Sequence, residues 1–86
     1  MKGYVYVIGD NVNKKFKIGS AKYPSTRLKQ LQTGNPINLV IVCRIPTDNM
    51  KFLETELHLK YKHRKIVREW FLLTWDDLAD LRALSF

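Results

Sequence analysis

Hydrophobic and polar positions near the start of the chain follow the pattern of two extended strands. The stretch "GYVYVIG" (3–9) is rich in β-branched and aromatic residues. The stretch "KFKIG" (15–19) then alternates between an apolar face and a face that carries Lys15, Lys17 and Gly19. Between them, "DNVNKK" has the Asp and Asn residues that are typical of hairpin turns. Together these features predict a β-hairpin.

A short helix and a third strand are predicted next. Pro24 suits the first turn of a helix, Leu28 and Leu31 supply its buried side, and Gly34 is a plausible stop after its end. The following segment "INLVIVCRIP" (37–46) is apolar on both faces until Arg44. We therefore expect a strand that is covered on both sides.

A second helix is expected to begin after Thr47 or Asp48, either of which can cap it, and to run to about His63. Its core stripe repeats at helical spacing and comprises Met50, Leu53, Leu57 and Tyr61. Phe52 and Leu59 fall outside this stripe, which suggests burial on a second side of the helix.

The last part of the chain combines a short apolar segment, "REWFLLT" (68–74), with a third helix. Thr74 can cap this helix, and Asp76 and Asp77 then lie in its first turn, where the helix dipole favours negative charge. The element order is β-β-α-β-α-α. It predicts a single α+β domain over residues 1–86, with a three-stranded antiparallel sheet flanked by helices.

The charge of the chain is large and unevenly distributed. Of the formal net charge of +7, residues 69–86 contribute −3, from four acidic residues against one arginine, so residues 1–68 carry +10. This asymmetry favours a polyanionic partner, nucleic acid before an anionic membrane, although a solvated basic surface would explain it too.

Location is constrained by what the sequence lacks. No apolar run approaches the roughly 20 residues of a membrane span. The first ten residues do not have the pattern of a signal peptide. A lone Cys43 inside an apolar run cannot form an intramolecular disulfide and is expected to be a buried thiol. We expect an intracellular protein, in the cytoplasm or nucleus of a host cell and not secreted.

Four motifs occur in a characteristic order. "GYVYVI" (3–8) is followed after an interval by "KIG" (17–19), and Arg27 comes eight residues after that glycine. Further on, "LETELHLKYKHRKIVREWFLL" (53–73) contains a Glu-x-x-x-His and a Glu-Trp-Phe pattern. From residue 3 to about residue 73 the chain resembles the GIY-YIG nuclease superfamily, and within it the phage and giant-virus branch of T5orf172 type.

Two positions depart from the motif that names the superfamily. The first motif reads Tyr-Val-Tyr instead of Gly-Ile-Tyr, and Lys17 stands where the second has tyrosine. Lysine is usual at that place in the branch that this chain resembles. The role of the position nevertheless stays open.

The resemblance implies a metal-dependent endonuclease, and it assigns the metal to Glu54. A carboxylate suits Mg²⁺ (or Mn²⁺), which commonly keeps several waters and takes only one or two protein carboxylates. On a helical wheel Glu54 and His58 share one edge of the core stripe, whereas Glu56 points elsewhere. The alternative is that Glu54 forms an ordinary ion pair at the edge of the helix, with His58 or Arg27.

Tyr6, Lys17 and Arg27 are the other main candidates. Arg27 fits a phosphate clamp, because its planar guanidinium binds two oxygens and keeps its charge. Tyr6 is the candidate general base, which requires a nearby cation to lower its pKa. Lys17, taken to lie opposite Tyr6 across the hairpin, would supply that cation. As alternatives, Tyr6 is a core aromatic residue and Arg27 a residue of the helix surface.

Three further residues have open roles. His58, one turn after Glu54, would shuttle a proton or bind the scissile phosphate, or it is simply a hydrogen-bonded helix histidine. Gly19 would allow a sharp turn beside the site or leave room for substrate. Glu69 would orient a catalytic residue or cap local structure, and the Trp70 and Phe71 that follow it are expected in the core.

Basic residues outside these motifs are expected to contact the phosphate backbone without reading bases. They are Lys15, Lys22, Lys60, Lys62, Arg64, Lys65 and Arg68. The expected partner is DNA, including branched or single-stranded forms, and the expected state is a monomer or weak dimer. The expected activity has little intrinsic sequence specificity. The main alternative is a nucleic-acid-binding module that keeps the fold without cutting.

Overall fold

The computed structural model describes residues 2–10, 12 and 14–85. The elements, in chain order, are β1 (Gly3–Asp10), β2 (Lys15–Ala21), α1 (Pro24–Gln32), β3 (Leu39–Thr47), α2 (Met50–Lys60), the 3-10 turn η1 (Lys62–Arg64), β4 (Lys65–Val67), β5 (Trp70–Phe71) and α3 (Trp75–Ala83). β1 and β2 form the predicted hairpin. Its expected turn residues 11 and 13 lie outside the described residues.

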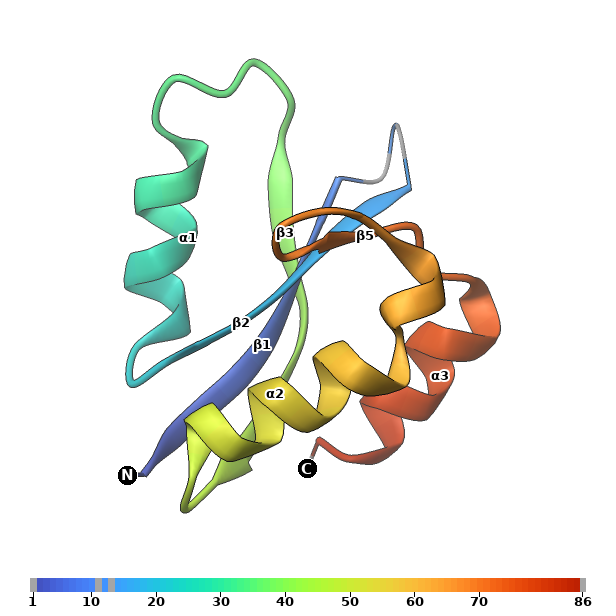
Figure 1. The fold of residues 1–86 in the computed structure, drawn as a ribbon. Coiled ribbons are helices and arrows are strands. Elements are labelled where there is room, and N and C mark those ends of the chain that lie inside the picture. Colours follow the sequence, from blue (N-terminus) through green and yellow to red (C-terminus); the bar gives the residue numbers. More distant parts are fainter. Residues whose placement is uncertain (1, 11, 13, 86) are drawn as a thin grey trace.

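The sheet has five strands in the order β3-β1-β2-β5-β4, with antiparallel neighbours (Figure 1). The prediction of three strands was therefore wrong. The two additional strands contain only three and two residues: β4 comes from the basic stretch after α2, and β5 from the apolar segment before α3. Strands this short have no measurable alternation. They join the sheet because β5 pairs with the edge of β2 and β4 pairs with β5.

The register of the hairpin determines which side chains are neighbours. Tyr6 is paired with Gly19, and Lys17 is paired with Ile8. The expectation that Lys17 lies opposite Tyr6 was wrong by two residues. Because residues two apart in a strand share a face, Lys17 still lies on the face of the sheet that carries Tyr6.

Helices cover both faces of the sheet (Figure 1). On one face Val5 and Val7 of β1 pack with Leu57 of α2 and with Leu78 and Leu81 of α3 in the larger core cluster. On the other face lies a smaller cluster, around Tyr6, Ile8 and Leu39, against which Leu28 and Leu31 of α1 pack. The predicted coverage of the third strand is confirmed, since α1 and α3 both contact β3.

The helix ends confirm some predictions and correct others. Pro24 opens α1, and Gly34 follows its end with φ of +76°. Thr74 caps α3 in a capping box with Asp77. For α2, however, neither expected residue caps the helix, because the side chain of Asn49 accepts the hydrogen bond from the amide of Phe52.

α2 also ends earlier and is less buried than expected. It stops at Lys60, and the turn η1 follows after Tyr61. Phe52 and Leu59 are 62% and 60% exposed, so the predicted second buried side does not exist. The sheet contacts α2 along its core stripe, and within the described residues no other layer covers the opposite side of the helix.

Two expectations from composition can be compared with the structure. Cys43 is a buried free thiol, as predicted. In the part of the chain that is described, no helix is both long enough and apolar enough to cross a membrane.

Candidate active site

The outer edge of β2 is only partly occupied by its neighbour. β5 pairs only with Phe16 and Lys17, so among the described residues the second half of β2 has a neighbouring strand, β1, on its inner side alone. Ile18 instead donates its amide to the backbone carbonyl of Glu69, at 3.0 Å. Its carbonyl oxygen lies 2.8 Å from Nε2 of His58, and because a carbonyl only accepts, this nitrogen carries the hydrogen. These two bonds bring α2 and the segment before β5 to one edge.

The bond from His58 also determines where Glu54 lies. Glu54 precedes His58 by about one helical turn, which spans about 5.4 Å along the axis. Ser20 follows Ile18 by two strand residues, or about 6.6 Å. The two spacings are similar, and the hydroxyl of Ser20 donates a hydrogen bond to Oε1 of Glu54. The Glu54 side chain is only 17% exposed.

A pocket of about 140 Å³, which we call the edge pocket, lies at this position. It is lined by Tyr6, Lys17, Ser20, Arg27, Leu31, Lys51, Glu54 and Glu69. Five residues singled out in the sequence thus lie together, with contributions from both strands of the hairpin and from both α1 and α2. His58 and Gly19 are not among the lining residues.

Lys17 is held by an ion pair. Its ammonium group lies 2.9 Å from Oε1 of Glu69, and the Lys17 side chain is 16% exposed. Glu69 therefore has a specific partner in the pocket, while its role in orienting a catalytic residue stays a prediction. The charge of Lys17 is largely neutralised by this carboxylate, so it is a weak source of the cation that Tyr6 was expected to need.

Tyr6 is almost completely buried, at 1% exposure, and its ring lies against Gly19. A Cβ atom at Gly19 would overlap the phenol, so the glycine makes room for Tyr6 within a strand. The expectation of a sharp turn at Gly19 was wrong. Burial raises the pKa of Tyr6 to about 12, against a smaller lowering by Arg27, and Glu69 and Glu54 raise it further. The expectation that a neighbouring cation lowers the pKa of Tyr6 was therefore wrong for the protein alone.

His58 has a structural position behind the pocket. Its Nε2 hydrogen is used by the carbonyl of Ile18, and its ring contacts Phe71 edge-on, with centroids 5.0 Å apart. Oε2 of Glu54 lies 3.8 Å from the same nitrogen, beyond hydrogen-bond distance. In this tautomer Nε2 cannot accept a proton, as in a hydrogen-bonded helix histidine. The roles of His58 as a proton shuttle or a phosphate ligand stay predictions.

The residues of the edge pocket fit a hard divalent cation. Glu54 offers a partly shielded carboxylate that is oriented by Ser20, and Glu69 offers a second carboxylate on the pocket wall. Within the described residues no group of three or more His, Cys, Asp and Glu could hold a metal. This excludes a zinc-type cage there, whereas Mg²⁺ commonly takes one or two carboxylates and completes its shell with water.

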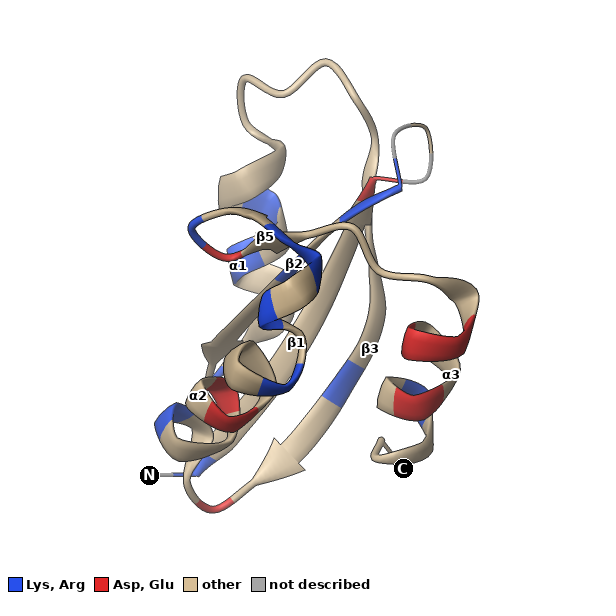
Figure 2. Cartoon of the chain, turned by 45° about the vertical axis from the view of Figure 1, so that its right-hand side comes forward, with Lys and Arg blue, Asp and Glu red and all other residues tan. Residues whose placement is uncertain are grey.

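The predicted phosphate-contacting residues lie mostly on the surface. Figure 2 shows basic residues on α1, α2 and the segment between α2 and β5, and acidic residues on α3. The exposed members are Lys15, Lys22, Lys60, Lys62, Lys65 and Arg68. Arg64 differs, because its Nε lies 3.0 Å from Oδ2 of Asp77 and so links η1 to α3.

Two residues of the pocket were missed in the sequence. Lys51 lies three positions before Glu54 in a predicted helix, so its spacing on the same side of that helix could have identified it. Ser20 gave no comparable signal, because the strand register and the docking of α2 together bring it to Glu54. Neither is part of the motifs quoted above.

A strand hairpin, an arginine on the first helix and a glutamate on the second lie around one pocket, as the resemblance to the GIY-YIG nuclease superfamily implies. The sequence model of the T5orf172 domain family matches residues 3–84 of the chain. The chain belongs to this T5orf172 family, a phage-type branch of the GIY-YIG-like nuclease superfamily, whose function is nuclease-like and related to DNA. No curated protein and no solved structure gives a significant match.

The buried phenol of Tyr6 predicts a specific loss of stability at alkaline pH. Because its folded pKa of about 12 exceeds the ordinary value of 10.0, the protonated phenol stabilises the fold fully below pH 10. That contribution is lost as pH rises from 10 towards 12. The free energy of unfolding, measured by urea denaturation, should therefore fall more steeply over this range for the parent than for Tyr6→Phe. Parallel curves would contradict the raised pKa.

Proposed function

We propose that the protein is a metal-dependent endonuclease that hydrolyses phosphodiester bonds in DNA with little intrinsic sequence specificity. The observation that carries this proposal is the convergence of Tyr6, Lys17, Arg27 and Glu54 on the edge pocket. Phosphodiester hydrolysis needs a positioned water, charge neutralisation on the phosphate and stabilisation of the departing oxygen. A carboxylate, a phenol and several cations around one pocket can meet these needs.

Glu54 would hold the cation, Mg²⁺ or Mn²⁺, with Ser20 orienting its carboxylate. When bound there, a divalent ion would polarise the phosphate and add positive charge that favours the ionised form of nearby acids. The hydrogen bond from Ser20 occupies Oε1 of Glu54, which leaves Oε2 as the better ligand atom.

Arg27 and Lys51 would bind the scissile phosphate. Both side chains line the edge pocket, and within the described part of the chain neither forms an ion pair. Arg27 has only a long hydrogen bond of 3.4 Å to Gln30 on its own helix. Its guanidinium is therefore available for two phosphate oxygens. Lys17, held by Glu69, would add a fixed charge to the pocket wall.

Tyr6 would position the attacking water. With a pKa of about 12, only about one phenol in 10⁵ is ionised at pH 7, so in the protein alone Tyr6 keeps its proton. A general-base role for Tyr6 would require additional positive charge in the pocket, because the ammonium of Lys17 is already paired.

The states of Tyr6 and Lys17 favour a second candidate function. A phenol that keeps its proton and a lysine that is neutralised by Glu69 describe a pocket that binds phosphate without activating water. A nucleic-acid-binding module would use the basic surface and Arg27 in the same way. For either function we propose DNA as the partner, a monomer or weak dimer as the state, and an intracellular location.

The first functional prediction concerns Glu54. Glu54→Gln keeps the size of the side chain and removes its charge, so nicking of plasmid DNA in Mg²⁺ or Mn²⁺ should fall by more than about 100-fold. EDTA should abolish nicking by the parent. The matched control is Glu56→Gln on the exposed side of the same helix, which should nick like the parent.

Two results would contradict the role of Glu54. One is parental nicking by a folded Glu54→Gln protein, with folding checked by circular dichroism and urea denaturation. The other is an equal loss in Glu56→Gln, which would show that the helix tolerates no change of charge. Absence of nicking by the parent with either ion, together with DNA binding, would favour the binding module.

The second functional prediction separates phosphate contact from structure in the basic segment after α2. Lys62→Ala and Lys65→Ala should each reduce the slope of log K against log salt for duplex DNA by about 0.9. Arg64→Ala should change this slope less and lower the free energy of unfolding instead, because Arg64 is paired with Asp77. Fluorescence anisotropy at several salt concentrations and urea denaturation measure the two effects. Unchanged slopes in both lysine variants would show that the segment is merely a solvated surface.

A further inference from the structure

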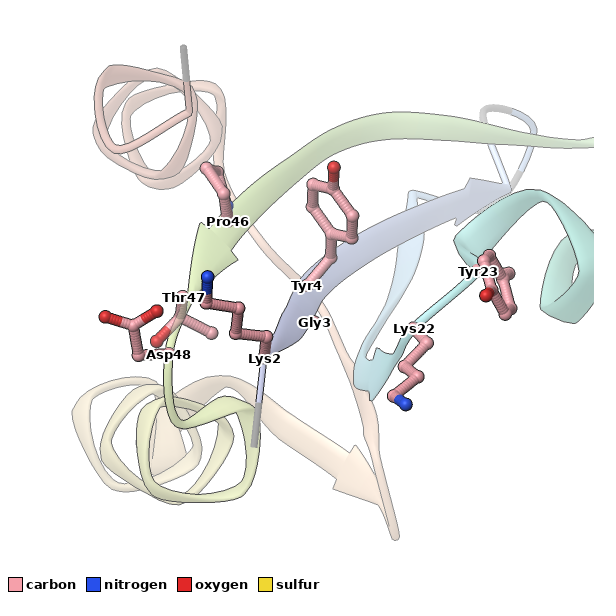
Figure 3. Close-up of a pocket in the computed structure, with 8 residues that line it drawn as sticks. All are labelled: Lys2, Gly3, Tyr4, Lys22, Tyr23, Pro46, Thr47 and Asp48. Atoms are coloured by element: carbon pink, nitrogen blue, oxygen red, sulfur yellow. The ribbon is translucent and has the colours of Figure 1, made fainter.

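A second and larger pocket, of about 590 Å³, opens at the end of the sheet where β1 begins (Figure 3). We call it the tyrosine pocket, after Tyr4 of β1 and Tyr23 of the segment before α1. Figure 3 shows the two rings on different sides of the pocket. Lys2 and Lys22 contribute two cations, and Asp48 contributes the one acidic side chain among its lining residues.

The side chain of Tyr23 has no evident role in the fold. Tyr23 occupies the N-cap position of α1, where Ser, Thr, Asp or Asn would be favoured, and it makes no side-chain capping bond. Its backbone carbonyl alone accepts the amides of Thr26 and Arg27. The side chain is 71% exposed, so burial does not explain it either. The exposed ring lies next to Lys22 in the chain and shares its pocket with Tyr4, and an aromatic ring combined with a cation suits a nucleic-acid strand.

At three places in the sequence, residues that line the tyrosine pocket are close to residues that line the edge pocket. Lys22 and Tyr23 lie between Ser20 and Arg27, which both line the edge pocket. Asp48 precedes Lys51 by three residues. Tyr4 lies on the same face of β1 as Tyr6, two residues earlier. A DNA strand whose phosphate is bound by Arg27 would therefore also reach Tyr23, which lies about one helical turn before Arg27.

We infer that the tyrosine pocket binds unpaired nucleotides of the DNA strand whose phosphate occupies the edge pocket. Exposed aromatic rings with lysines beside them form a stacking platform for single strands, because bases stack on the rings while the cations track the backbone. Paired bases are already stacked in the duplex and cannot stack on Tyr23. The inference deepens the proposed function, on which it rests, by making DNA with an unpaired segment the preferred substrate.

The test measures binding separately from cleavage. Labelled single-stranded and duplex oligonucleotides of equal length are titrated in EDTA and followed by fluorescence anisotropy. Tyr23→Ser removes the ring and supplies a favourable N-cap residue, so α1 should remain intact. Binding of the single strand should weaken by about 5- to 150-fold, the effect of losing one stacked base, and duplex binding should change little.

Two matched controls and one further variant complete the design. Tyr23→Phe retains the ring and should bind the single strand like the parent. Trp75→Ser removes an aromatic residue of similar exposure, 67%, from α3, outside the tyrosine pocket, and should also bind like the parent. Lys22→Ala should reduce the salt slope for the single strand by about 0.7.

The outcomes distinguish this inference from the proposed function. If Tyr23→Ser binds single strands like the parent, or loses duplex and single-strand binding equally, the inference is wrong even when the parent nicks DNA. If the parent does not nick any DNA but Tyr23→Ser selectively loses the single strand, the stacking platform holds and the endonuclease proposal fails.

Discussion

The backbone of Ile18 is the point on which the site depends. β5 pairs with only two residues of β2. The amide and carbonyl of Ile18, which face away from β1, therefore lie beyond β5. Because buried backbone groups require hydrogen-bond partners, these two groups need partners from elsewhere. Glu69 supplies a carbonyl to the amide, and His58 supplies Nε2–H to the carbonyl. The first bond brings the Glu69 side chain to Lys17, and the second places Glu54 beside Ser20. A local requirement of the sheet edge thus assembles two carboxylates at one place.

The electrostatics of the edge pocket follow from this arrangement. Glu69 takes up the charge of Lys17, while Arg27 on α1 and Lys51 on α2 remain available to an anion. Tyr6, buried behind Gly19, keeps its proton because desolvation and the two carboxylates outweigh Arg27. The pocket therefore combines positive charge with one oriented carboxylate, and its phenol is neutral at physiological pH. In the proposed function the positive charge would bind a phosphate and the carboxylate would bind a cation.

The long elements and the motif residues could be predicted from the sequence, because strong periodicity and end signals determine them locally. The three helices and first three strands were of this kind, and Arg27 and Glu54 were identified by motif spacing. β4 and β5 could not be predicted, since strands of three and two residues form only where an edge is open. Ser20 and the pair between Lys17 and Glu69 depend on register and on contacts 34 and 52 residues apart in the chain. Such contacts leave no local pattern.

We propose that the edge of β2 and α2 together form a divalent-cation site. Paramagnetic broadening by Mn²⁺ in amide spectra of the ¹⁵N-labelled protein tests it without any need for catalysis. The amide signals of Ser20 and Glu54 should broaden first as Mn²⁺ is added. Glu54→Gln should remove that effect while its spectrum remains that of a folded protein. Broadening centred instead on Asp76, Asp77 and Asp80 of α3, and unchanged in Glu54→Gln, would contradict the account.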